Sequence, residues 1–247
     1  MNLKKSAKAR KKEKCFLVEG PRMFFEIPKD RIEECYLTEE FEDKYAEELK
    51  GWHYELISEN VCKHLSDTKT PQGVIAVVRR TEPSIEELLH KEKNPCFFLL
   101  ENLQDPGNLG TIVRTAEGAG VTGIIMNRET VDIYNPKVIR STMGSVYRMP
   151  FCYVSDFGAA IRELKKEGVK WYAAHLRGTG AHDTMDYTVP SGFLIGNESK
   201  GLSDETADLA DAYVRIPMCG QVESLNAAIS TAVIAYEVLR QRSTGKK

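Results

Sequence analysis

The segment FLIGNESKGLSDE, residues 193–205, places a carboxylate and an ammonium group between two glycines, directly after an apolar run. The glycines are Gly196 and Gly201, and the charged residues are Glu198 and Lys200. Either glycine alone could belong to a simple turn. Glycine accepts backbone conformations and close approaches that other residues do not. The backbone of this loop can therefore lie against a ligand with no side chain between them, and we interpret the loop as one wall of a pocket.

A second polar loop opens the segment ENLQDPGNLGTIVRTAEGAGV, residues 101–121. Its Asp-Pro-Gly sequence predicts a turn, and Asn108 is predicted to cap the helix that follows. Arg114 lies about 200° around that helix from Ile112, because each residue advances about 100°. Arg114 therefore points away from the buried side, toward either solvent or a cleft. By itself it is typical of a surface arginine.

A third polar loop lies in RIPMCGQVESLNAAISTAVIAYEVLRQR, residues 215–242. Ser224 and Asn226 are placed near the start of a predicted helix, where ordinary capping is the alternative to chemistry. The helix shows two apolar faces, which predicts one face packed on the core and another covered by a partner.

Strand and helix patterns alternate from residue 96 onward. The predicted strands are 96–100, 123–126, 151–154, 171–174, 193–196 and 213–217, and the predicted helices are 108–119, 135–143, 157–167, 204–210 and 222–242. Apolar strands without alternation, separated by helices, indicate an α/β fold with a parallel sheet covered on both faces. Such sheets bind ligands beyond the carboxyl ends of their strands, which here means the three polar loops.

The first half of the chain is predicted to form a small α/β unit over residues 15–80. A connector over residues 81–95 follows, in which Ser84 and Glu87 have the spacing of a capping box. Residues 1–14 hold seven Lys/Arg and one Glu, so this arm carries +6 while the rest of the chain carries −8. The asymmetry favours a polyanionic partner such as nucleic acid, or else a solvated tail that aids solubility.

The six cysteines are scattered without a CxxC pair, which is typical of reduced thiols in a cytosolic protein and argues against structural zinc. The longest apolar runs are too short to cross a membrane, and no apolar region follows the basic arm. We therefore expect a cytoplasmic protein that needs no metal.

The three polar segments, taken together and in this order, are specific for one protein family. DPGNLGTIVRTAEGAGV, FLIGNESKGLS and RIPMCGQVESLNAAISTAVIAYE closely resemble the motifs of the SpoU/TrmH family, S-adenosylmethionine-dependent RNA ribose 2′-O-methyltransferases of the SPOUT class. The resemblance covers residues 96–242. The segments FLVEGPRMFFE and TPQGVIAVVRR resemble, more weakly, the small L30e-like substrate-binding domain that precedes the catalytic domain in many members.

The resemblance implies a knotted methyltransferase domain over residues 96–247, with a C-terminal trefoil knot, and an L30e-like RNA-binding domain over residues 15–80. It also implies a homodimer formed through the C-terminal helix. The implied reaction transfers a methyl group from S-adenosylmethionine to a ribose 2′-OH, in ribosomal RNA more than in transfer RNA. A non-catalytic RNA-binding relative is a further alternative, whereas a nucleotide enzyme is disfavoured because no GxGxxG or Walker loop is present.

The resemblance also assigns residues. The implied donor-binding residues are Leu194, Ile195, Gly196, Asn197, Gly201, Ile216, Met218 and Leu225, and the implied catalytic set is Arg114, Ser224, Asn108, Glu198 and Asn226. Family members are thought to brace the site with the glutamate and to tie the motifs together with the two asparagines. A guanidinium stays protonated in proteins and is a poor base, so we expect Arg114 to hold a phosphate while the proton leaves by another route.

Overall fold

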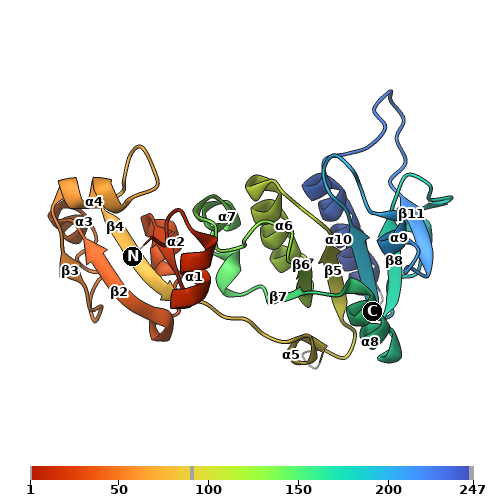
Figure 1. Ribbon diagram of the computed structural model, residues 1–247, viewed down its shortest axis with the longest axis horizontal. Coiled ribbons are helices and arrows are strands. Elements are labelled where there is room, and N and C mark those ends of the chain that lie inside the picture. Colours follow the sequence, from red (N-terminus) through yellow and green to blue (C-terminus); the bar gives the residue numbers. More distant parts are fainter. Residues whose placement is uncertain (1, 90–91, 245–247) are drawn as a thin grey trace. The chain divides into compact units, whose positions relative to one another are not determined.

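The computed structural model describes residues 2–89 and 92–244, and the chain divides into two compact units (Figure 1). The first unit comprises Met1–Thr81 with Asp132–Tyr147, and the second comprises Glu82–Val131 with Arg148–Lys247. The predicted arm, connector and methyltransferase domain include residues 1, 90–91 and 245–247, which lie outside the described residues. The first unit thus includes residues 132–147, which lie far beyond the predicted end of the first domain at residue 80.

A parallel sheet of seven strands forms the second unit, in the order β7-β6-β5-β10-β8-β11-β9. The strands are β5 (Cys96–Leu100), β6 (Gly123–Asn127), β7 (Phe151–Val154), β8 (Lys170–Ala174), β9 (Gly180–Ala181), β10 (Ser191–Ile195) and β11 (Ala212–Arg215). The predicted parallel α/β sheet is confirmed. The edge strand β9 was not predicted, because two residues are too few to show a periodic pattern.

The helices of the second unit are α5 (Ile85–Leu89), α6 (Pro106–Gly118), α8 (Phe157–Lys166), η3 (His182–Thr184), α9 (Asp204–Ala207) and α10 (Ala227–Thr244). Figure 1 shows α6 and α10 side by side, and the two helices are in contact. The stripe Ile112, Ala116 and Ala119 is buried, as predicted. The capping box is also confirmed, since Ser84 N donates to Glu87 Oε2 over 2.6 Å and Glu87 N donates to Ser84 Oγ over 3.2 Å.

Two predicted helix starts were wrong, and both errors come from capping. Helix α6 is capped by Asp105, whose carboxylate accepts from Asn108 N over 2.8 Å, rather than by Asn108. Pro106 suits the first helical position because it has no N–H to satisfy, and this moves the cap back to Asp105. Helix α10 begins at Ala227, not at residue 222, because Asn226 accepts from Ala228 N and Ile229 N and so ends the preceding loop.

The first unit holds a four-stranded sheet in the order β1-β4-β2-β3. Its strands are β1 (Cys15–Glu19), β2 (Ile32–Leu37), β3 (Glu55–Leu56) and β4 (Val74–Arg79), and its helices are α1 (Ala7–Glu13), α2 (Pro21–Phe25), η1 (Lys29–Arg31), α3 (Glu39–Lys44), α4 (Glu59–Leu65), α7 (Pro136–Thr142) and η2 (Ser145–Tyr147). Strand β4 is antiparallel to both β1 and β2. Helix α7 packs on β1 although it is encoded some 120 residues later.

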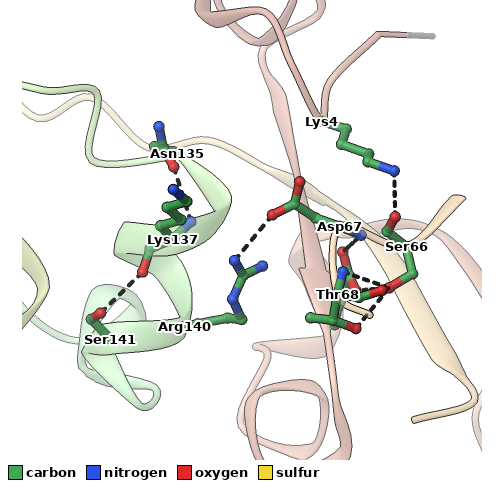
Figure 2. A network of polar contacts seen from close by, with 9 residues as sticks. Lys4, Ser66, Asp67, Thr68, Asn135, Lys137, Arg140 and Ser141 are labelled. Atoms are coloured by element: carbon green, nitrogen blue, oxygen red, sulfur yellow. Dashed lines mark hydrogen bonds and ion pairs between the residues drawn. The ribbon is translucent and has the colours of Figure 1, made fainter. Parts of the chain in front are cut away.

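Polar contacts hold the arm and α7 within the first unit. Arg140 of α7 donates from Nη2 to Asp67 Oδ2 over 3.0 Å, and Lys4 donates to the carbonyl of Ser66 (Figure 2). Arg10 is only 3% exposed and donates to Asp132 Oδ2 over 2.7 Å. The arm is therefore not a solvated tail. It is a short helix docked on the sheet.

Replacing Arg10 by alanine is expected to lower the free energy of unfolding of the first unit by about 3 kcal/mol, because Asp132 is left without its buried cation. Urea denaturation followed by the fluorescence of Trp52, with Trp171 replaced by Phe, reports on this unit alone. The control is Arg79→Ala, which breaks a pair with Glu33 whose side chains are 55% and 39% exposed. That loss is expected to stay below about 1 kcal/mol. An equal decrease in the free energy of unfolding in both variants would show that the Arg10–Asp132 pair stabilises the unit no more than the exposed pair does.

None of the helices in the described part of the chain is long and apolar enough to cross a membrane.

Candidate functional site

A cavity of about 310 Å³ opens in the second unit at the carboxyl ends of β8, β10 and β11. Its walls come from the residues that follow these strands, and the first two turns of α10 close one side. The volume lies at the lower end of the range for small-molecule sites. Two of the three predicted polar loops, those after β10 and β11, line this cavity.

The loop after β10 folds back on itself. Asn197 and Gly201 exchange two backbone hydrogen bonds of 3.0 and 2.9 Å, and Asn197 Oδ1 accepts from Ser199 N and Lys200 N. A Cβ on Gly196 would lie 2.1 Å from the backbone of Gly201, and Gly201 itself has φ +70°. Both glycines are therefore needed for the loop to close. Glycine is required at these two positions because the loop packs closely against its own backbone.

Glu198 joins this loop to the loop that precedes α6. Its Oε1 accepts from Asp105 N over 2.9 Å and from Asn108 Nδ2 over 3.1 Å, while Oε2 accepts from Gln104 N over 3.1 Å. Burial disfavours the charged form of Glu198, yet these hydrogen bonds outweigh it and hold the pKa of the carboxyl below its usual value. Glu198 is thus an ionised tie between two loops that lie more than 90 residues apart in the sequence.

Asn108 extends the tie to the third loop. Asn226 Nδ2 donates to Asn108 Oδ1 over 2.9 Å, while Asn226 Oδ1 caps α10. Glu198, Asn108 and Asn226 therefore form one hydrogen-bonded chain across the three motifs. The motifs are separate in the sequence, and the sheet brings all three to one edge.

Most of the predicted site residues meet at the cavity. The residues that line it include Ile195, Gly196, Asn197, Glu198, Gly201, Ile216, Met218, Ser224 and Leu225. Asn108 and Asn226 stand behind this lining, in the network just described. Leu194 is fully buried and belongs to the apolar core of the sheet, together with Leu99 and Trp171. The lining does not include Leu194, so its contact with a ligand stays a prediction.

Arg114 lies on the exposed side of α6, as predicted, and does not line the cavity. Its exposed side chain can therefore contact a second molecule that approaches from outside. Among the described residues there is no group of three or more His, Cys, Asp or Glu side chains that could hold a metal ion.

Sequence reasoning missed Glu101, which directly follows β5. This carboxylate is 7% exposed and accepts from Ser203 N, Ser203 Oγ and Thr206 Oγ1. It fixes the far end of the loop after β10, at the start of α9. A charged residue immediately after a fully apolar strand was the available signal.

Sequence reasoning also missed two histidines that line the cavity: His175, which follows β8, and His182, which follows β9. Burial and the neighbouring Arg177 lower the pKa of His175, so its imidazole is neutral near pH 7. Its Nδ1 accepts from Arg177 N over 3.1 Å. The site therefore combines apolar side chains with the charged residues Glu198, Lys200, Arg215 and Glu223, and the neutral imidazole of His175 lies in the same wall.

Family models match both parts of the chain. Residues 95–236 match the model described as the SpoU rRNA Methylase family. Residues 1–76 match an MRM3-like substrate binding domain.

Individual proteins match over nearly the full length. The 23S rRNA (guanosine(2553)-2′-O)-methyltransferase RlmP of Bacillus subtilis is 31% identical over 234 residues, which cover 94% of this chain and 91% of that protein. The crystal structure of the SpoU methyltransferase AviRb from Streptomyces viridochromogenes superposes with a TM-score of 0.87 at 27% identity, covering 98% and 95% of the two chains. An AdoMet-bound rRNA methyltransferase from Sinorhizobium meliloti gives 0.83 at 31% identity, covering 95% and 90%.

Proposed function

This chain belongs to the SpoU rRNA methylase family, and on that premise we propose that it transfers a methyl group from S-adenosylmethionine to a ribose 2′-OH of ribosomal RNA. The observation that carries the proposal is the cavity at the carboxyl ends of β8, β10 and β11. The hydrogen-bond network of Glu198, Asn108 and Asn226 holds the loops around it. Transfer RNA is the alternative substrate, because relatives of this chain also bear TrmH-family tRNA/rRNA names.

The residues of the cavity fit a nucleoside-like methyl donor. Ile195, Ile216 and Leu225 offer apolar walls for an adenine ring, and the backbone around Gly196 and Gly201 offers hydrogen-bonding groups. We propose Leu194, Asn197 and Met218 as further donor-binding residues.

The donor supplies an already activated methyl group, so the protein has to orient the acceptor and let its proton leave. We propose that Arg114 holds a phosphate of the RNA through its planar guanidinium, which fixes the ribose oxygen behind the methyl carbon. Ser224, exposed in the cavity wall, is proposed to contact the acceptor hydroxyl. We propose a positioning role for Glu198, Asn108 and Asn226, since their side chains hydrogen-bond the loops of the site to one another.

We propose that the active form is a homodimer joined through α10. Ile229 and Tyr236 of this helix are 50% and 53% exposed, which is high for large apolar side chains and supports a covered face. A trefoil knot in the second unit, an L30e-like fold in the first and a cytoplasmic location complete the proposal. The knot and the L30e-like fold rest on the family resemblance of the sequence, and the location rests on its scattered cysteines and short apolar runs.

The test uses methyl-labelled S-adenosylmethionine with unmodified ribosomal RNA and, separately, unmodified transfer RNA. Label recovered as a 2′-O-methylnucleoside from ribosomal RNA alone is the expected result. Label in transfer RNA alone would replace the substrate class but keep the reaction. Donor binding without transfer to either RNA would support a non-catalytic relative, and absence of donor binding would reject the cavity as the donor site.

A further inference from the structure

The exposed lysines of α1 all lie on one face of the helix. Lys11 and Lys12 fall about 60° and 40° to either side of Lys8, because three residues advance about 300° and four about 400°. Arg10 falls about 200° from Lys8, on the opposite side, and it is buried. The helix therefore separates a docking side from a cationic side.

The docking side is anchored at two points. Leu3 is 1% exposed and packs in an apolar cluster with Cys15 and Val77 of the sheet. Arg10 donates to Asp132 Oδ2 and, from Nη1, to the carbonyl of Leu3 over 2.6 Å. Ser6 caps the helix by accepting from Ala9 N. These contacts hold the lysine face in one place on the first unit.

Three carboxylates near the arm are already engaged by groups other than the lysines of α1. Asp132 is paired with Arg10, and Asp67 is paired with Arg140 at 3.0 Å (Figure 2). Glu19 accepts from the hydroxyl of Ser66 and from Asp67 N.

The lysines of the cationic side keep their charge unneutralised. Within residues 2–89 and 92–244, Lys8 and Lys11 have no ion-pair partner, and Lys12 has Glu13 at 3.8 Å with its own side chain 81% exposed. An ion pair that long and that exposed contributes little. The surface presents three neighbouring positive charges that can bind an anion of another molecule.

We propose that Lys8, Lys11 and Lys12 bind the phosphate backbone of the RNA substrate as a preformed array. The inference rests on the proposed function and adds a defined contact surface to it. Lysine is a compact point charge that suits phosphate, and phosphate contacts fix the position of a nucleic acid without reading its sequence. Because the helix is already docked, less conformational freedom is lost on binding than for a flexible tail. RNA is favoured over an acidic protein because the chain belongs to a family of RNA-modifying enzymes.

The test compares the full chain with the triple variant Lys8→Gln, Lys11→Gln and Lys12→Gln, which removes the charges at similar helix propensity. The probe is 23S ribosomal RNA transcribed in vitro, titrated at several salt concentrations. Each lost phosphate contact reduces the slope of log affinity against log salt by about 0.7 to 0.9, so the loss of three contacts is expected to reduce the slope by about 2 to 3. Affinity near 0.1 M salt is expected to fall at least about tenfold. Affinity for S-adenosylmethionine is expected to stay the same.

The matched control removes three other exposed lysines of the same unit: Lys44→Gln, Lys50→Gln and Lys63→Gln. Its slope is expected to match that of the unaltered chain. An unchanged slope in the α1 variant, or equal losses in both variants, would overturn the proposed surface while leaving the methyl-transfer proposal intact. Loss of self-association instead of RNA affinity would assign the lysine face to a second copy of the chain, and would overturn the proposal too. An unaltered chain that neither binds nor methylates RNA would overturn both proposals.

Discussion

The Arg114→Ala protein is expected to bind S-adenosylmethionine as the unaltered chain does, but to transfer methyl groups to RNA about 10²–10³-fold more slowly. Arg114 is exposed on α6 and does not line the donor cavity, so the donor loses no contact. The RNA loses the cation that we propose to orient its ribose, and small misplacements of a reacting atom cost about a hundredfold in rate. Donor affinity by calorimetry and single-turnover transfer of label separate these two effects.

Two companion variants sharpen this result. Arg114→Lys keeps the charge but loses the planar pair of donors, so an intermediate rate is expected if the residue holds phosphate. Arg162→Ala removes another exposed arginine of the same unit, on α8, and should leave the rate unchanged. Full transfer activity in a folded Arg114→Ala protein that binds the donor would remove Arg114 from the mechanism.

The Glu198→Ala protein is expected to bind S-adenosylmethionine about 10- to 100-fold more weakly. The carboxylate is the common acceptor for Gln104 N, Asp105 N and the side chain of Asn108, and hydrogen bonds to a charged group contribute more than neutral ones. Without it the loop after β10 is no longer tied to the loop before α6. A tenfold change corresponds to about 1.4 kcal/mol of binding free energy, a modest share of what three such bonds contribute.

The pH dependence of the unaltered chain gives an independent check on Glu198. Its folded pKa lies below the ordinary value of 4.5, so the tie is complete above that pH and is lost as pH falls toward the lowered pKa. Donor affinity should therefore not change through the titration of this carboxyl above pH 4.5. The control variant is Glu205→Ala, an exposed carboxylate on α9, for which donor affinity should stay unchanged. Equal affinity in Glu198→Ala and Glu205→Ala would show that the loops hold their shape without the tie.

The two halves of the molecule differed in how far their sequence could be interpreted. In the second half, fully apolar strands such as 96–100 and 193–196 have no exposed face, and this pattern is produced by a parallel sheet covered on both sides. The order of strands and helices and the placing of the polar loops followed from it. Helix starts did not, because the cap of α6 depends on which of Asp105 and Asn108 turns its side chain back to the backbone.

In the first half, charge alone could not decide between a tail and a bound arm. The arm is held on the first unit because Asp132, about 120 residues away in the sequence, pairs with Arg10. No local sequence pattern predicts such a pair, because ion pairing depends on the distance between the two groups in space and on their burial.

The sequence by itself determined the parallel α/β sheet, the three loops that carry the chemistry and the family to which the chain belongs. These are encoded locally, in the apolar pattern of each strand and in the residues of each motif. The tertiary structure alone decided that Glu198, Asn108 and Asn226 form one hydrogen-bonded chain, that Glu101 supports the same loop and that α7 packs with the first unit. Such contacts join segments about 90 to 130 residues apart, and only the folded backbone brings their donors and acceptors within hydrogen-bonding distance.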